Sequence, residues 1–164
     1  MKKIGITGSL ASGKTTASQI LTSGKLPLFS ADKIVSRLYS KNNFRLILFK
    51  QFKIKKNLNL KKNIRKKILE NKANIKKLEK IIHPLVRKEM RKFLKKNIKK
   101  KFVFLEIPLL FKSDLVKIFD IIFYIKAKKS IRLKRFILKG GKRSIFNMLN
   151  LKQLSDEKKM KYCE

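Results

Sequence analysis

The chain has 164 residues, a length that fits one domain with a small appendage. Its formal net charge is +35, but the basic residues are mainly lysines. Specific nucleic-acid recognition relies more on arginine, so we attribute the charge to compositional drift at tolerant surface positions. The single cysteine, Cys163, excludes a disulfide framework, and no stretch approaches the roughly 20 apolar residues of a membrane span. These features favour a cytoplasmic protein without a membrane partner or a specific nucleic-acid partner.

The amino-terminal part of the chain has the pattern of alternating strands and helices. Residues 3–7 form an apolar run directly before a glycine-rich segment, which predicts a buried first strand. Residues 14–22 place apolar side chains at helical spacing, so we predict a helix there. A second short strand is predicted over residues 26–29 and a helix over residues 33–39. This order is typical of the start of a parallel sheet.

The middle of the chain, residues 42–101, has a different character. Leu, Ile and Phe recur every three or four residues among many lysines, without the alternation of a strand. We therefore predict a set of helices. Because proline is tolerated at the first position of a helix, Pro84 predicts the start of a new helix that ends near residue 96.

The remaining part returns to strands and helices. Residues 102–107 and 120–125 are apolar runs rich in β-forming residues, and both predict strands that are covered on two faces. The pattern as a whole predicts an α/β protein with a parallel sheet flanked by helices and joined by right-handed crossovers. The helices predicted in this part cover residues 129–138, 144–151 and 156–162.

The strongest chemical signal is the segment from Gly8 to Thr15, which matches G-x-x-x-x-G-K-S/T between a predicted strand and a predicted helix. Its glycines let consecutive backbone N–H groups converge on phosphate oxygens, and the helix that follows adds its positive end. Lys14 would reach the β- and γ-phosphates, and the Thr15 hydroxyl would coordinate Mg²⁺. The motif predicts a site for ATP or GTP at this loop, whose predicted cofactor-binding residues are Gly8, Ala11, Ser12, Gly13, Lys14 and Thr15.

Asp32 lies just past one predicted strand and Glu106 lies at the end of another, where a parallel sheet delivers side chains to a cleft. Asp32 could accept the proton of an attacking hydroxyl or hold a water molecule on Mg²⁺, or it could be a helix N-cap. Glu106 could reach Mg²⁺ through water, or it could pair with one of the many lysines. Both interpretations remain open for each residue.

Three basic or titratable side chains are further candidates. Arg132 and Arg135 lie on the predicted helix 129–138 and could clamp phosphates through charge-assisted hydrogen bonds, or they could be exposed helix arginines. His83 is the only histidine. A lone histidine is more often a cap or a packed side chain than a ligand.

Together these segments resemble the dephospho-CoA kinase family. The matches are collinear, cover nearly the whole chain, and are more specific than the phosphate-binding motif alone. They are I-G-I-T-G-S-L-A-S-G-K-T-T at residues 4–16, S-A-D-K-I-V-S-R at 30–37, H-P-L-V at 83–86, I-P-L-L-F at 107–111, L-K-R at 133–135 and Q-L-S-D-E-K at 153–158.

The resemblance implies ATP-dependent phosphorylation of the ribose 3′-hydroxyl of dephospho-CoA, the last step of coenzyme A synthesis, with Mg²⁺. It implies that the ATP site extends to Thr16 and that Asp32 activates the acceptor, with Lys14 as the other catalytic residue. Arg135 is assigned to the cofactor, and Thr15 and Glu106 to the metal. The substrate-binding residues by the same resemblance are Asp32, Arg37, His83 and Pro108.

The resemblance also implies a domain plan. We expect one P-loop kinase domain over residues 1–164, with residues 1–40 and 102–138 as the nucleotide-binding core. Residues 41–101 would form a helical insertion that binds the substrate, and residues 139–152 a short lid. Ser30, Lys112 and Lys139 depart from the family pattern. Family members continue into a further strand and helix, so we expect this chain to be truncated at its carboxyl end.

Other functions remain open from the sequence alone. The phosphate-binding motif does not name its acceptor, so another nucleoside or nucleotide kinase of the same fold is the first alternative. A lysine-rich nucleic-acid-binding protein or an inactive remnant would belong to a different class. The absence of an aromatic RNA-binding signature disfavours the nucleic-acid binder.

Overall fold

The computed structural model describes residues 1–55, 59–71, 73–107, 114–151, 153, 156–160 and 163. The chain folds into two compact units. The first, called the sheet unit here, comprises Met1–Ala31 and Leu94–Glu164. The second, the helical unit, comprises Asp32–Phe93. Within the described ranges, none of the helices has both the length and the apolar character that crossing a membrane requires.

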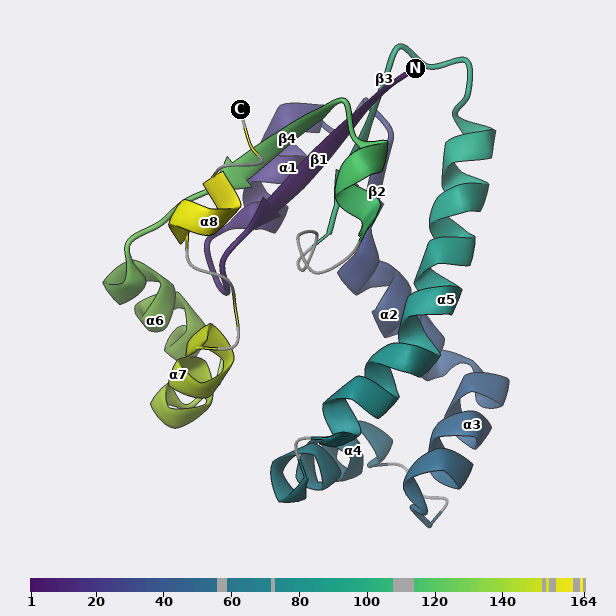
Figure 1. The fold of residues 1–164 in the computed structure, drawn as a ribbon, viewed down its shortest axis with the longest axis vertical. Helices are drawn as coiled ribbons and strands as arrows, with labels where there is room; N and C mark the ends of the chain where they lie inside the picture. Colours follow the sequence, from purple (N-terminus) through teal and green to yellow (C-terminus); the bar gives the residue numbers. More distant parts are fainter. Residues whose placement is uncertain are drawn as a thin grey trace. The chain divides into compact units, whose positions relative to one another are not determined.

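The sheet unit is built on four parallel strands in the order β2-β3-β1-β4 (Figure 1). The apolar runs form these strands because their side chains are covered by the surrounding helices and by one another. Ile6, Val103 and Leu105 are fully buried. The prediction of a parallel α/β sheet is therefore confirmed. The strands are β1 (Lys2–Gly8), β2 (Leu28–Ser30), β3 (Phe102–Glu106) and β4 (Ile121–Ile125).

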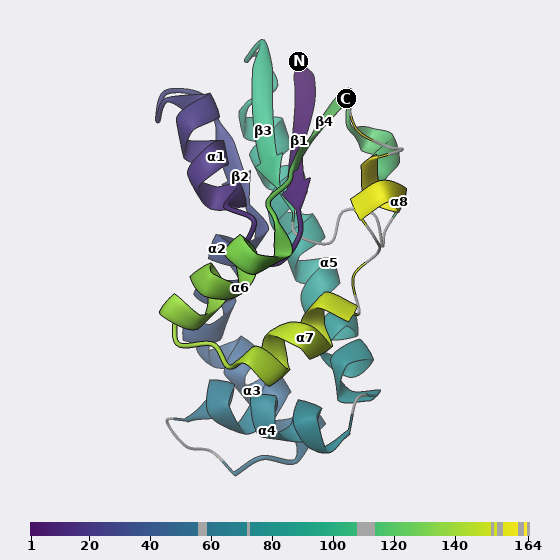
Figure 2. The same cartoon turned by 90° about the vertical axis from the view of Figure 1, so that its left-hand side faces the viewer.

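Helices α1, α6, α7 and α8 complete the sheet unit (Figure 2). Helix α1 packs against β1 and β3, and α6 packs against α7. The rings of Phe136 and Phe146 meet between α6 and α7, with centroids 5.6 Å apart. The bounds of these elements are α1 (Lys14–Thr22), α6 (Lys129–Leu138), α7 (Arg143–Leu151) and α8 (Asp156–Met160), with a short 3₁₀-helix, η2 (Asp114–Ile118), before β4.

The helical unit has an apolar core made by residues at helical spacing. Leu48 and Ile64 lie at its centre, and the rings of Tyr39 and Phe44 meet edge to face with centroids 5.4 Å apart. Periodic Leu, Ile and Phe in a lysine-rich stretch thus form helices whose apolar stripes face inward. The helices are α2 (Ala31–Ser40), α3 (Asn42–Phe52), α4 (Leu60–Glu70) and α5 (Ala73–Lys96).

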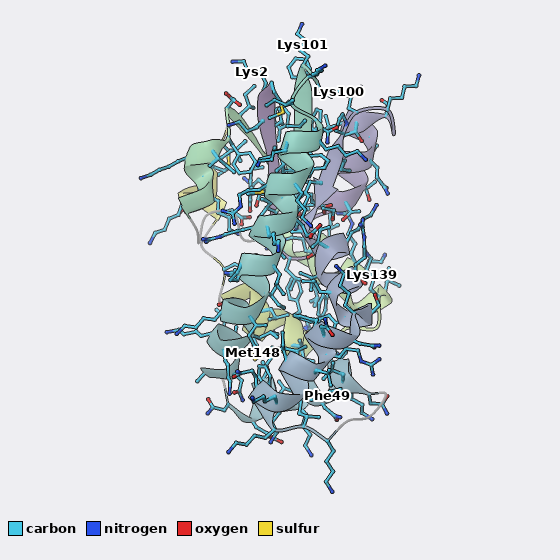
Figure 3. All side chains as sticks on the ribbon, turned by 90° about the vertical axis from the view of Figure 1, so that its right-hand side faces the viewer. Lys2, Phe49, Lys100, Lys101, Lys139 and Met148 are labelled. Atoms are coloured by element: carbon cyan, nitrogen blue, oxygen red, sulfur yellow. The ribbon has the colours of Figure 1, made fainter. Side chains whose placement is uncertain are left out.

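The lysines give the molecule its solvated exterior. Figure 3 shows Lys2, Lys100 and Lys101 gathered at one end of the sheet unit, with their side chains pointing outward. All three are exposed. Such positions tolerate lysine at little cost in stability, because the ammonium groups remain hydrated.

One sequence prediction about the helices is wrong. We expected Pro84 to begin a new helix, but it lies inside α5. A proline within a helix removes one backbone hydrogen bond and commonly bends the helix, and α5 changes direction along its length (Figure 1). The loss is offset because the neighbouring Ile82 and Leu85 pack into the apolar core of the helical unit.

The helical unit also differs in extent from the insertion expected at residues 41–101. It begins at Asp32, because Ile34 and Leu38 of α2 pack into its core. It ends at Phe93, so the last turn of α5 belongs to the sheet unit.

Candidate active site

The loop between β1 and α1, residues 8–15, is called the phosphate loop here. A Cβ atom at Gly8 would lie 2.5 Å from the Ile125 carbonyl oxygen and 2.7 Å from the Ser12 Oγ, so only glycine fits. Gly13 has φ 100°, a conformation that residues with a side chain rarely adopt, and Ala11 has φ 58°. The local sequence therefore fixes a tightly curled backbone at the end of β1.

The phosphate loop leads directly into the amino terminus of α1. Gly13 is the N-cap residue, and no side chain caps the helix. The first backbone N–H groups of a helix lack intrahelical acceptors, and with the helix dipole they favour an anion. The Ser12 Oγ is buried within the loop and has no hydrogen-bond partner. These donors suit phosphate oxygens. Thr16 lies in the first turn of α1 and is exposed.

The Lys14 ammonium group lies over the curled backbone. Its Nζ donates hydrogen bonds to the carbonyl oxygens of Gly8 at 3.2 Å and Ser9 at 3.0 Å. The side chain is half-buried, and both of these acceptors are neutral. An anionic phosphate oxygen is a stronger acceptor for an ammonium group than a carbonyl oxygen. Lys14 is thus placed to exchange loop carbonyls for phosphate.

Glu106 and Thr15 meet at the carboxyl edge of the sheet. Glu106 ends β3 and pairs in register with Ile6 of β1 and Ser30 of β2. The Thr15 hydroxyl donates a hydrogen bond of 2.7 Å to the Glu106 Oε1. Glu106 is 1% exposed, and its Oε2 has no hydrogen-bond partner. A buried carboxylate oxygen without a partner is costly, so this position requires a ligand such as a cation or an ordered water.

These two oxygen-bearing side chains fit a magnesium ion. Among the described residues there is no group of three or more His, Cys, Asp or Glu side chains that could hold a metal. Mg²⁺ does not need one, because it is usually bound through one or two carboxylates, water and substrate phosphates. The Thr15 hydroxyl donates its hydrogen bond to Glu106, which leaves the Thr15 oxygen lone pairs available for a cation.

Two arginines of α6 contact the phosphate loop in different ways. Arg135 is exposed and donates to the Ser12 carbonyl oxygen at 2.9 Å. Arg132 is buried, so the interpretation of it as an exposed arginine is wrong. Its guanidinium group donates to the Ala127 carbonyl oxygen at 3.1 Å, the Asn150 Oδ1 at 2.7 Å and the Leu10 carbonyl oxygen at 3.4 Å. Arg132 therefore fastens α6 and α7 to the loop.

The sequence reasoning missed a polar cluster that contacts the phosphate loop. The Asp156 Oδ1 of α8 accepts hydrogen bonds from the Tyr124 hydroxyl at 2.6 Å and the Ser9 hydroxyl at 2.7 Å. The Lys159 ammonium group donates to the Ser9 Oγ at 2.8 Å, and the Gln153 Oε1 accepts from the Leu10 N–H at 3.2 Å. The cluster thus joins α8 and the segment before it to the second and third residues of the phosphate loop.

The pKa values in this cluster follow from burial and hydrogen bonding. Burial, followed by the hydrogen bond to Asp156, raises the pKa of Tyr124 to about 12. Burial also opposes ionisation of Asp156, but the hydrogen bonds from Tyr124 and Ser9 and the charge of Lys159 outweigh it and lower its pKa. Burial lowers the pKa of Lys159, and Asp156 partly counteracts that effect.

The other predicted site residues belong to the helical unit or lie outside the described residues. Asp32 is in the first turn of α2, so the N-cap interpretation is wrong, although a carboxylate there still suits the helix dipole. Arg37 is in the last turn of α2, and His83 is in α5. Asp32, Arg37 and His83 are all exposed. Pro108 lies outside the described residues.

A family model described as dephospho-CoA kinase matches residues 2–164. The chain belongs to the dephospho-CoA kinase family. It is 35% identical to the dephospho-CoA kinase of Rickettsia conorii, covering 98% of this chain and 84% of that protein. It is also 35% identical to the dephospho-CoA kinase of Bartonella quintana, covering 97% of this chain and 84% of that protein.

Two solved structures share the fold of this chain. Protein TT1252 from Thermus thermophilus is 28% identical and superposes with a TM-score of 0.79, covering 98% of this chain and 84% of that one. Dephospho-CoA kinase from Campylobacter jejuni is 25% identical, with a TM-score of 0.68 and coverage of 100% and 86%. The family assignment makes this chain a kinase with a P-loop type of α/β fold.

Proposed function

We propose that this chain transfers the γ-phosphoryl group of ATP to the ribose 3′-hydroxyl of dephospho-CoA, giving coenzyme A and ADP. The observation that carries the proposal is the phosphate loop, whose Lys14 lies over the Gly8 and Ser9 carbonyl oxygens and whose Thr15 is hydrogen-bonded to Glu106 at the end of β3. It occurs in a chain that matches the dephospho-CoA kinase family from residue 2 to residue 164.

The sheet unit would bind ATP. The N–H groups of the phosphate loop and of the first turn of α1 would hold the phosphates. Lys14 would leave the carbonyl oxygens of Gly8 and Ser9 to neutralise charge on the β- and γ-phosphates. Arg135, which contacts Ser12 at the same loop, would add a second cation near the transferred group. This arrangement stabilises the charge that spreads over the phosphoryl group in the transition state.

Thr15 and Glu106 would hold Mg²⁺, which supplies charge neutralisation at the β- and γ-phosphate oxygens when bound. The fit rests on the buried Glu106 carboxylate, whose Oε2 has no hydrogen-bond partner, and on the Thr15 hydroxyl that donates to it. By accepting the hydrogen bond of Thr15, Glu106 would leave the Thr15 oxygen lone pairs available to the cation. It would also accept a hydrogen bond from metal-bound water.

The acceptor would be activated by Asp32. A ribose hydroxyl is a poor nucleophile at neutral pH, so a carboxylate that orients it and takes its proton speeds the attack on phosphorus. Asp32 is exposed in the first turn of α2 and can be reached by a ligand. Arg37, His83 and Pro108 would contact dephospho-CoA.

The domain roles and the cellular setting complete the proposal. The helices of residues 41–101 would bind dephospho-CoA, and residues 139–152 would act as a lid. The protein would act in the cytoplasm on a small-molecule substrate. Its excess of lysine would give only salt-sensitive, non-specific binding to polyanions, because each neutralised phosphate releases counterions.

An acceptor panel tests this function. ADP formation from ATP and Mg²⁺ is followed with dephospho-CoA, adenosine, AMP or no acceptor, and the product from dephospho-CoA is identified by chromatography and phosphorus NMR. We expect turnover with dephospho-CoA to exceed the other reactions, with phosphate on the 3′-oxygen. Preferred turnover of adenosine or AMP would identify a different nucleoside or nucleotide kinase. Folded protein that turns over none of them would be an inactive remnant.

A further inference from the structure

Lys159 differs from the other lysines of this chain in its surroundings. Among the lysines within the described ranges, it alone is buried, with 6% of its surface exposed. A buried ammonium group loses hydration and needs hydrogen-bond acceptors and a counter-charge. Its Nζ finds these at the Ser9 Oγ, 2.8 Å away, the Gln153 Oε1, 3.4 Å away, and Asp156, 3.6 Å away.

Ser9 connects this buried lysine to the phosphate loop. The Ser9 carbonyl oxygen accepts hydrogen bonds from the Lys14 Nζ at 3.0 Å and from the Ser12 N–H at 3.1 Å. Its hydroxyl accepts from Lys159 and donates to Asp156. One loop residue is therefore held at its carbonyl oxygen by Lys14 and at its hydroxyl by Lys159.

The cluster can fix Ser9 with little freedom. The Asp156 Oδ1 accepts from both Ser9 and Tyr124, and the Lys159 ammonium group lies 5.6 Å from the centroid of the Tyr124 ring. Gln153 holds the next residue of the loop through its N–H. Rigid support of this kind positions groups that must hold a ligand within a fraction of an ångström.

We propose that Lys159 is a positioning residue for ATP, acting through Ser9 on the conformation of the phosphate loop. The inference rests on the proposed role of that loop as the ATP site. Lys159 itself does not touch the nucleotide. Its loss removes one of the hydrogen bonds that hold the Ser9 hydroxyl to α8. The Ser9 carbonyl oxygen that aligns Lys14 and the Ser12 N–H is then held less firmly, and the loop binds phosphates less well.

A purely structural role for Lys159 would have a different signature. If the cluster only holds α8 in place, substitution of Lys159 lowers the melting temperature and leaves the kinetic constants of the folded enzyme unchanged. If Lys159 positions the loop, its substitution weakens the binding of ATP and leaves the binding of dephospho-CoA unchanged. The effect then depends on Ser9.

The test uses Lys159→Met, Ser9→Ala and the double variant, with Ile122→Val as a stability control in the buried part of β4. Kinetic constants and ATP affinity by calorimetry are measured well below the melting temperatures. We expect Lys159→Met to raise the KM for ATP about tenfold, the value of one hydrogen bond from a charged donor. The KM for dephospho-CoA should change by less than about twofold, and kcat should fall less than the KM for ATP rises.

The double variant decides whether Lys159 acts through Ser9. We expect its KM for ATP to equal the higher of the two single-variant values, because both substitutions break the same link. Multiplied effects in the double variant, or a Lys159→Met enzyme that is less stable but binds ATP normally, would overturn the proposal. Should Lys159→Met not fold, Ser9→Ala decides alone, and an unchanged KM for ATP in it would overturn the proposal.

The measurements also separate this inference from the proposed function. Wild-type protein that binds ATP but does not phosphorylate dephospho-CoA would contradict the function and leave the positioning test intact. Wild-type protein that phosphorylates dephospho-CoA, with ATP affinity unchanged in both single variants, would contradict the positioning role alone.

Discussion

The sheet unit and the helical unit bury different kinds of side chain. In the described part of the chain, every buried polar or charged residue lies in the sheet unit, including Ser9, Ser12, Glu106, Arg132 and Lys159. The buried residues of the helical unit are all apolar, and its core is made of Leu, Ile, Phe and Met side chains. Burying polar groups lowers the stability that the sheet unit could otherwise have, whereas the helical unit is stabilised by apolar packing.

The difference indicates where each kind of function can reside. Buried, hydrogen-bonded groups are preorganised, so the sheet unit suits a site that must hold charged phosphates. The candidate residues of the helical unit, Asp32, Arg37 and His83, are all exposed on helices. Substitution of the exposed candidate residues should therefore change activity and leave stability unchanged. Substitution of the buried apolar residues of the helical unit should do the opposite.

The largest expected effect is on kcat, from the substitution of one exposed acid of the helical unit. Asp32→Asn should lower kcat by about 10²- to 10⁴-fold, the usual range for a general base, and leave stability and ATP affinity nearly unchanged. The matched control is Glu70→Gln, which removes an exposed acid of α4 and should behave like the wild type. Reduced ATP affinity in Asp32→Asn would assign Asp32 to metal binding instead, and wild-type turnover would remove it from the mechanism.

The apolar core of the helical unit should respond in the opposite way. Leu48 is fully buried in α3, and Leu48→Ala should lower the free energy of unfolding by about 2–5 kcal/mol through lost burial and a cavity. Leu46 is an exposed residue of the same helix, and Leu46→Ala should change the free energy of unfolding by less than about 0.5 kcal/mol. Denaturant unfolding measures both. A large fall in kcat for folded Leu48→Ala enzyme would contradict the expectation that the apolar core of the helical unit affects stability alone.

Glu106 should affect the metal dependence of the sheet unit. Glu106→Gln keeps the shape of the side chain but removes the charge beside Thr15, so the Mg²⁺ concentration for half-maximal activity should rise by about 10- to 100-fold. Glu89→Gln, which removes a half-buried acid of α5, is the control. The account fails for Glu106 if magnesium titrations of the two variants coincide.

The smallest expected effect is the dependence of stability on Asp156 at low pH. The pKa of Asp156 is lowered in the folded protein from its ordinary value of 3.8, so its contribution is present above pH 3.8 and is lost as pH falls through the folded-state pKa. Asp156→Asn should lower the melting temperature near neutral pH by on the order of 2–4 °C. Thermal scans should show this difference shrinking below pH 3.8. A constant difference would mean that the charge of Asp156 is not involved.

The sequence predicted best what depends on local patterns. The curled backbone around Gly8 and Gly13 follows from glycine chemistry, and Glu106 follows from its place at the end of an apolar run. The helix predicted at residues 129–138 is confirmed with the same bounds.

What the sequence could not predict depends on tertiary contacts. Lys159 cannot be singled out among so many lysines until α8 brings it to Ser9, and Tyr124 resembles any other residue of an apolar strand. Gln153 and Asp156 lie in a segment that resembles the family, which was the only available signal. The continuation of α5 through Pro84 likewise depends on packing that overrides the local preference.

The central claim is that the phosphate loop of the sheet unit performs phosphoryl transfer to dephospho-CoA. The most direct measurement is the rate of coenzyme A formation by wild type, Lys14→Ala and the matched exposed lysine variant Lys25→Ala, with melting temperatures recorded in parallel. We expect Lys14→Ala to lose at least about 100-fold in rate with its fold intact, because the ammonium group over the phosphates is gone, while Lys25→Ala matches the wild type. Coenzyme A formation by Lys14→Ala at the wild-type rate would contradict the account.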